Sequence, residues 1–169
     1  MLTLESERLR LRPFDVNDAT FLLELLNEPG WKAFIRDHDI ETADAAGAYI
    51  EKSYLSTYPT GKGFLVVEHK ETHLPMGICG LIDRDYLDTT DLGFAFLERH
   101  WGKGFAGEAA LAVVDDARQR LKLASLLAIT MAENTRSIAL LLRLGFCFDG
   151  PVQDPATGES LRAYRLVLQ

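Results

Sequence analysis

Three short β-type segments follow one another without a helix between them, and this order constrains the fold more than any other feature. Segments 63–69, 75–83 and 90–98 are rich in β-branched and aromatic residues, and turn-forming residues separate them. Connections this short join antiparallel neighbours, because a parallel pair needs a crossover of a dozen or more residues. The middle of the chain is therefore predicted to form an antiparallel meander.

A single helix–strand–helix unit follows the meander. Residues 105–121 carry apolar side chains at helical spacing, and 125–131 form the nearly continuous apolar run of a central strand. Residues 134–146 are predicted to form a helix that Asn134 caps and Gly145 ends. One such unit after a meander predicts an α+β fold with a mixed, mostly antiparallel sheet flanked by helices.

The flanking segments complete this plan. Residues 8–14 alternate apolar and basic side chains and are predicted to form a strand, followed by a helix that Pro29 and Gly30 end. Residues 42–58 are predicted to form a second helix with Thr42 as its cap. Two strands joined by the turn-rich stretch 151–160 end the chain.

Length and charge narrow the class of protein. The chain of 169 residues is long enough for one domain and too short for two, so residues 1–169 are predicted to be one domain. A formal net charge of −7 argues against a nucleic-acid binder, which needs a basic face. No apolar run approaches the ~20 residues that span a bilayer, and the start is unlike a signal peptide. We therefore expect a cytoplasmic protein that binds neither membrane nor nucleic acid.

Cysteine and histidine spacing predicts no metal site. Cys79 and Cys147 lie far apart, without a CxxC pair. The stretch HKETH at 69–73 differs by one position from a zinc-binding helix motif, and it falls where a hairpin turn is predicted.

Three glycines precede the strongest predicted helix, in the pattern Gly102-x-Gly104-x-x-Gly107. A glycine-rich turn that enters a helix exposes several backbone N–H groups, and the helix dipole adds positive potential. Because glycine lacks Cβ, phosphate oxygens can approach the backbone closely, and Lys103 adds a charge. The pattern predicts an anion site without saying which anion it takes.

The same spacing is that of the dinucleotide-binding fingerprint, and Glu133 lies where a ribose-binding acid would stand. However, in that fold the strand runs directly into the first glycine and usually opens the domain. Here residues 98–101 intervene after about 100 residues of other structure. The stretch also does not match the phosphate-binding P-loop motif, because it does not end in Gly-Lys-Ser/Thr.

Three motifs together resemble the GNAT superfamily of N-acetyltransferases. WGKGFAGEAA (101–110) resembles its acyl-CoA pyrophosphate loop, and ENTRSIALLLRLGF (133–146) resembles the paired downstream motif. ERLRLRPF (7–14) resembles the opening strand of the Rim-type branch, which includes acetyltransferases of ribosomal-protein N-termini. The resemblance runs from about residue 5 to the end, with the motifs in family order. It implies the GNAT acyl-CoA N-acyltransferase fold, with a sheet splayed between its fourth and fifth strands, 90–98 and 125–131.

The resemblance also implies a CoA site. The backbone of 101–106 would cradle the pyrophosphate, the strand near Phe96 and Leu97 would pair with the pantetheine arm, and Asn134 would hydrogen-bond that arm. Trp101 departs from the Gln or Arg with which the family loop begins, a departure common in the Rim-type branch. The implied CoA-binding residues are Phe96, Leu97, Trp101, Gly102, Lys103, Gly104, Phe105, Ala106, Gly107, Asn134 and Ser137.

Acetyl transfer by direct attack of an amine needs a proton donor for the leaving thiolate. Many family members use a tyrosine seven residues after the asparagine, but this chain has Leu141 there. Ser137 is therefore the predicted acid, with Asn134 beside it, and N–H groups near Phe96 and Leu97 would stabilise the oxyanion. The base stays open among Glu133, Asp83, Asp85, Asp91 and His100.

The predicted activity is transfer of the acetyl group of acetyl-CoA, without a metal, to a small amine or a protein N-terminus. Trp31, Phe34 and Tyr49 lie in the region that walls the acceptor site in the family, where core packing is an equal alternative. Family members often form homodimers. Two other functions stay open: a CoA- or nucleotide-binding module without turnover, and an NAD-dependent oxidoreductase.

Overall fold

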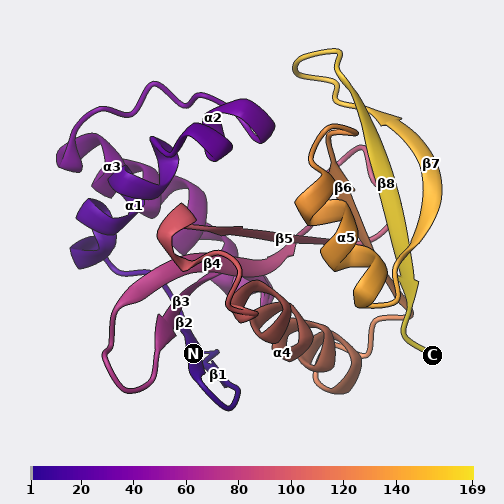
Figure 1. Ribbon diagram of the computed structural model, residues 1–169, viewed down its shortest axis with the longest axis horizontal. Helices are drawn as coiled ribbons and strands as arrows, with labels where there is room; N and C mark the ends of the chain where they lie inside the picture. Colours follow the sequence, from indigo (N-terminus) through magenta and orange to yellow (C-terminus); the bar gives the residue numbers. More distant parts are fainter. Residues whose placement is uncertain (1) are drawn as a thin grey trace.

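The structure, a computed structural model that describes residues 2–169, is organised around one eight-stranded sheet (Figure 1). The strand order is β1-β2-β3-β4-β5-β6-β8-β7, and neighbours run antiparallel except β5 and β6, which are parallel. The strands are Leu4–Glu5 (β1), Leu9–Arg12 (β2), Gly63–His69 (β3), Pro75–Ile82 (β4), Asp91–Phe96 (β5), Ser125–Thr130 (β6), Cys147–Gln153 (β7) and Ser160–Val167 (β8). The predicted α+β class with a mostly antiparallel sheet is confirmed, and β3 to β5 are the predicted meander.

The sheet is splayed between β5 and β6. Within residues 2–169, only Asp91 and Leu127 are in register across these two strands. Beyond that pair the strands diverge, so the backbone of β5 from Leu92 onward lacks a partner strand on that side. This confirms the splay between the fourth and fifth predicted strands, which the short strand β1 shifts to β5 and β6 in the structure.

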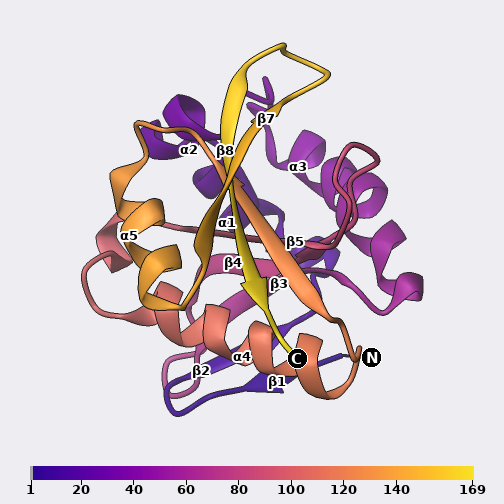
Figure 2. The same cartoon turned by 90° about the vertical axis from the view of Figure 1, so that its right-hand side faces the viewer.

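Helices cover both faces of the sheet, as the views in Figures 1 and 2 show. They are Ala19–Leu26 (α1), Pro29–Phe34 (α2), Ala43–Tyr49 (α3), Phe105–Gln119 (α4) and Thr135–Arg143 (α5). Strand alternation divides the core: Leu65 and Val67 pack on the α4 side, whereas Val66 packs with α1 to α3. Helix α5 lies beside β6 and contacts α4, where a Cβ on Gly107 would lie 3.3 Å from Leu140.

Two predicted helix boundaries are wrong. Helix α1 ends at Leu26, and Pro29 begins α2, where its missing N–H leaves no hydrogen bond unmade. Thr42 caps α3 as predicted, with Oγ1 accepting from the Ala45 N–H at 3.1 Å, but α3 ends at Tyr49. The chain then continues as a π-helix, Ile50–Tyr54, and a 3-10 helix, Leu55–Thr60. In this stretch side-chain hydroxyls donate hydrogen bonds to backbone carbonyls.

None of the helices within residues 2–169 has both the length and the apolar character needed to cross a membrane. The cytoplasmic location and the single domain stay predictions.

Candidate active site

The glycine loop has the backbone shape that only glycine adopts freely. Gly102 and Gly104 have φ of 74° and 80°, in the left-handed region. Gly104 is the N-cap of α4, so no side chain satisfies the first N–H groups of this helix. A Cβ on Gly102 would meet nothing within 4 Å, so the loop surface is open. The loop therefore presents free backbone donors and the positive end of a helix dipole to an anion.

A cavity of about 330 Å³ lies between this loop and α5. All but two of the predicted CoA-binding residues line it: Phe96, Trp101, Gly102, Gly104, Phe105, Ala106, Gly107, Asn134 and Ser137. The sequence motifs at 101–110 and 133–146 thus form opposite walls of one cavity.

Leu97 and Lys103 are the two that the structure does not bring into this cavity. The Leu97 side chain is fully buried, and its N–H donates to the Met76 carbonyl at 2.9 Å because the β4–β5 ladder continues there. That N–H is therefore unavailable to an oxyanion. Lys103 contributes a carbonyl that accepts from Nη1 of Arg8 at 3.0 Å.

Trp101 is fixed at the start of the loop. Its Nε1 donates to the Phe96 carbonyl at 2.9 Å, and a Cβ on Gly30 would lie 3.3 Å from its ring. The guanidinium carbon of Arg136 lies 4.4 Å from the centroid of the Trp101 ring. Arg136 and Arg143 both line the cavity, and sequence reasoning missed them. Their spacing of seven residues on a predicted helix, which puts both on one face, is the signal that could have found them.

Asn134 and Ser137 stand where α5 begins. Asn134 caps the helix, and its Oδ1 accepts from the Ser137 N–H at 3.4 Å. This bond uses the Ser137 backbone and leaves the hydroxyl for another partner. Leu141, in the position of the family tyrosine, is buried in the core.

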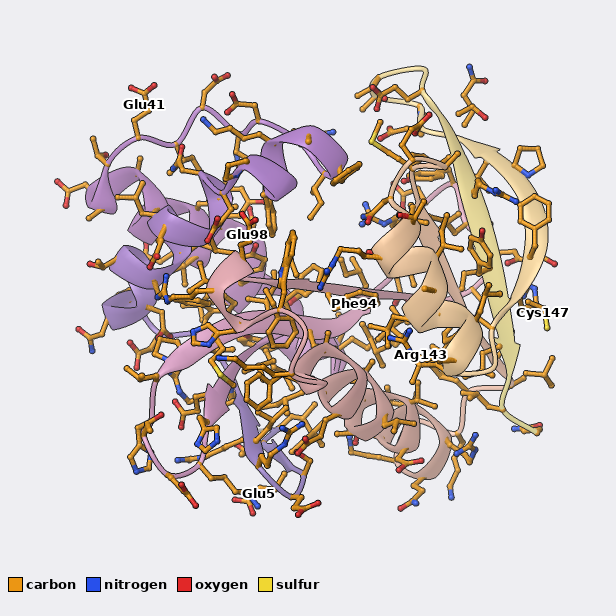
Figure 3. The ribbon with its side chains drawn as sticks, in the orientation of Figure 1. Glu5, Glu41, Phe94, Glu98, Arg143 and Cys147 are labelled. Carbon is orange, nitrogen blue, oxygen red and sulfur yellow. The ribbon has the colours of Figure 1, made fainter. Side chains whose placement is uncertain are left out.

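A second cavity, of about 360 Å³, lies on the α2–α3 side of the splay. Aromatic side chains form much of its wall: Trp31, Phe34, Tyr49, Tyr54, Phe64, Tyr86 and Phe94. The two cavities share Trp31, Phe34, Ile35, Phe94, Ala95, Asn134 and Ser137. They therefore meet at the splay, and Figure 3 shows Phe94 in the space between β5 and α5.

The predicted base candidates are scattered. Glu133 and His100 line the first cavity and Asp91 the second. Asp83 and Asp85 line neither; hydrogen bonds from Lys62 and Thr90 hold the pKa of the Asp83 carboxyl below its usual value. Across residues 2–169, no three His, Cys, Asp or Glu side chains are grouped to hold a metal ion.

Asp91 is the one candidate that is fully buried. Burial raises the pKa of its carboxyl to about 6, although Arg84 Nε, 2.8 Å from Oδ2, favours the charged form. Its Oδ1 has no hydrogen-bond partner within residues 2–169. The folded protein therefore holds a proton on Asp91 at a pH where the unfolded chain has lost it.

This burial predicts a pH dependence of stability. The folded pKa of about 6 lies above the ordinary 3.8, so the stabilising effect of the bound proton is complete below about pH 4 and is lost as pH rises through 6. The free energy of unfolding of the wild type, relative to Asp91→Asn, is expected to fall by up to about 3 kcal/mol across that window. Denaturant unfolding at several pH values measures it.

Asp83→Asn is the control for this measurement. Because the pKa of Asp83 is lowered, wild-type stability relative to this variant should rise with pH. A difference between wild type and Asp91→Asn that is flat with pH would contradict the assignment.

Known proteins resemble the whole chain. Residues 8–147 match the family model described as the acetyltransferase (GNAT) domain. An uncharacterized N-acetyltransferase p20 of Bacillus licheniformis is 31% identical over 99% of this chain and 96% of its own length.

Solved structures show the same likeness. An acetyltransferase from Agrobacterium tumefaciens C58 has a TM-score of 0.83 at 27% identity and covers 98% of this chain and 94% of its own. RimL, a ribosomal L7/L12 alpha-N-protein acetyltransferase solved with coenzyme A, has a TM-score of 0.85 over 99% of this chain and 98% of its own. At 13% identity this likeness shows that RimL and the present chain share the fold.

Proposed function

The chain belongs to the GNAT acetyltransferase family, and on this premise we propose that it transfers the acetyl group of acetyl-CoA to a primary amine by direct attack. Members of the family use acetyl-CoA, so the chain is an acetyl-CoA-dependent acyltransferase. The proposal concerns the acceptor, a small amine or a protein N-terminus, and the residues that act on it. The observation that carries it is the meeting of two cavities at the splayed strands.

The first cavity fits the CoA part of acetyl-CoA. Its loop offers uncapped N–H groups at a helix start, and its two left-handed glycines leave the approach free of Cβ atoms. The backbone of Trp101 to Ala106 would hold the pyrophosphate there. A phosphate-bearing ligand is what such a loop stabilises.

The open side of β5 fits the pantetheine arm. Leu97 donates to β4, and residues alternate along an antiparallel ladder, so the N–H of Phe96 points away from β4 toward the splay. The Phe96 carbonyl already accepts from Trp101. The Phe96 N–H is therefore the donor of this pair that remains for the arm or for the oxyanion.

The second cavity would hold the acceptor, so that amine and thioester meet beside Asn134 and Ser137. Acetyl-CoA supplies an activated acetyl group. In the transfer the amine nitrogen bonds the carbonyl carbon and the carbon–sulfur bond breaks. Ser137 would donate a proton to the leaving sulfur while Asn134 holds the arm, and the proton that the amine nitrogen loses would pass through water to restore the Ser137 hydroxyl. Aligning the two reactants supplies much of the rate by raising their effective concentration.

Release of free CoA thiol tests this function. Purified protein is incubated with acetyl-CoA and, separately, with N-terminal peptides, polyamines, aminoglycosides and amino acids. The expected result is amine-dependent thiol release above spontaneous hydrolysis for at least one class. Binding of acetyl-CoA with no release for any amine would instead favour a CoA-binding module without turnover.

A further inference from the structure

Two arginines of α5, Arg136 and Arg143, form no ion pair with the residues that the structure describes. Most arginines of this chain ion-pair with a carboxylate, as Arg8 does with Glu108 at 2.7 Å. Both arginines of α5 line the first cavity, opposite the glycine loop. The first cavity therefore holds two arginines without an ion pair, and Glu28 and Glu133 line it as well.

The position of Arg136 is electrostatically unfavourable without a ligand. It is the second residue of α5, whose first turn has no acidic residue, and cations are disfavoured at that end of a helix dipole. The fixed ring of Trp101 holds its guanidinium beside the loop. A bound anion at the loop would compensate this charge.

Arg143 lies further from the reacting end of the cavity. Seven residues separate it from Arg136, so both project from one face of α5. At 1.5 Å per residue it stands about 9 Å beyond Ser137 along the helix. Leu140, between them, faces α4, since a Cβ on Gly107 would lie 3.3 Å from it. Figure 3 shows Arg143 on the side of α5 that faces α4.

We propose that Arg136 binds the pyrophosphate of CoA and that Arg143 binds its ribose 3′-phosphate, which makes the site selective for the 3′-phosphorylated cosubstrate. The two arginines are assigned to the two phosphate groups by their distance from the acyl end of the cavity. Ser137 and Asn134 mark the acyl end, because both cavities reach them. Arg136 is next to Ser137 in α5, whereas Arg143 lies about 9 Å further along the helix. The inference rests on the proposed function, which puts CoA in this cavity.

A phosphate monoester suits an unpaired guanidinium. It carries up to two negative charges, and a guanidinium matches it with two parallel N–H donors. The loop amides, which face the pyrophosphate, leave the 3′-phosphate without a partner of its own. Arg143 supplies one.

Titration calorimetry with CoA and with dephospho-CoA, which lacks the 3′-phosphate, tests the proposal. The wild type is expected to bind CoA more tightly. Arg143→Gln should weaken CoA binding roughly tenfold, as loss of a charge-assisted hydrogen bond predicts, and leave dephospho-CoA unaffected. Arg136→Gln should weaken both ligands by similar factors.

Arg162→Gln is the matched control. Arg162 also stacks on an aromatic ring, with its guanidinium carbon 4.5 Å from the Phe148 centroid, and it lines neither cavity. The affinity of the Arg162→Gln variant for CoA and for dephospho-CoA should equal that of the wild type. Thermal unfolding of all variants checks that each folds.

The outcomes separate this inference from the proposed function. If the wild type binds CoA but Arg143→Gln weakens both ligands equally, or neither, the 3′-phosphate assignment is overturned and CoA binding stands. If the wild type binds neither ligand, both the inference and the proposed function fall.

Discussion

Replacing Gly104 with valine is expected to abolish measurable binding of acetyl-CoA. Gly104 has a φ of 80°, a conformation that a β-branched residue avoids, and it caps the helix that is proposed to face the pyrophosphate. The valine would move the loop out of this conformation and turn its amides away from the phosphate, and its Cβ would lie 3.4 Å from Nη2 of Arg8. Titration calorimetry on the variant should detect no heat of binding at concentrations that saturate the wild type.

Gly158→Val separates this effect from general strain. Gly158 also has a positive φ, of 73°, with nothing within 4 Å of its Cβ position, and it lies in the β7–β8 turn outside both cavities. Both variants should lose on the order of 1–2 kcal/mol of unfolding free energy. Only Gly104→Val should lose binding; normal binding by that variant would show that the loop is not the phosphate cradle.

Replacing Ser137 with alanine is expected to lower turnover by about 10²–10⁴-fold, the usual contribution of a positioned proton donor. The Kd for acetyl-CoA should change little. The reason is geometric: Ser137 lines both cavities at their junction, and the Asn134 cap uses only its backbone N–H, which alanine keeps. Steady-state thiol release gives the turnover, and titration calorimetry gives the Kd.

Ser160→Ala, at the exposed start of β8 and outside both cavities, is the control and should match the wild type. Equal losses of affinity and turnover in Ser137→Ala would make Ser137 a binding residue instead. Unchanged turnover would remove it from the chemistry.

The sheet could be predicted because its pattern is local. Short connections and β-rich composition fix the meander, and β3 has the predicted bounds. The helical region between β2 and β3 was less predictable, since proline favours both the end of one helix and the first turn of the next. In this structure Pro29 is the first residue of α2. The splay itself came from the family resemblance, and nothing in the local pattern of residues 90–98 encodes it.

Part of the candidate site could likewise be predicted from the local sequence, and part of it could not. The shape of the loop could be predicted because Gly102 and Gly104 adopt the left-handed conformation that glycine favours. The Leu97 N–H was wrongly expected at the oxyanion because N–H groups alternate sides along a strand, and the N–H of Leu97 points to β4, where it donates to the Met76 carbonyl. The approach of Arg136 to Trp101 depends on how α5 packs across the cavity, which no short-range pattern determines.

Thermal unfolding with acetyl-CoA, CoA and NAD side by side distinguishes a CoA site from a dinucleotide site at the glycine loop. A ligand present at about 100 times its Kd adds about 2.7 kcal/mol to the free energy of unfolding. For a chain of this size that raises Tm by about 5–10 °C. This rise is expected with both CoA species, and no rise is expected with NAD. A rise with NAD alone would contradict this expectation and restore the dinucleotide interpretation of the glycine loop.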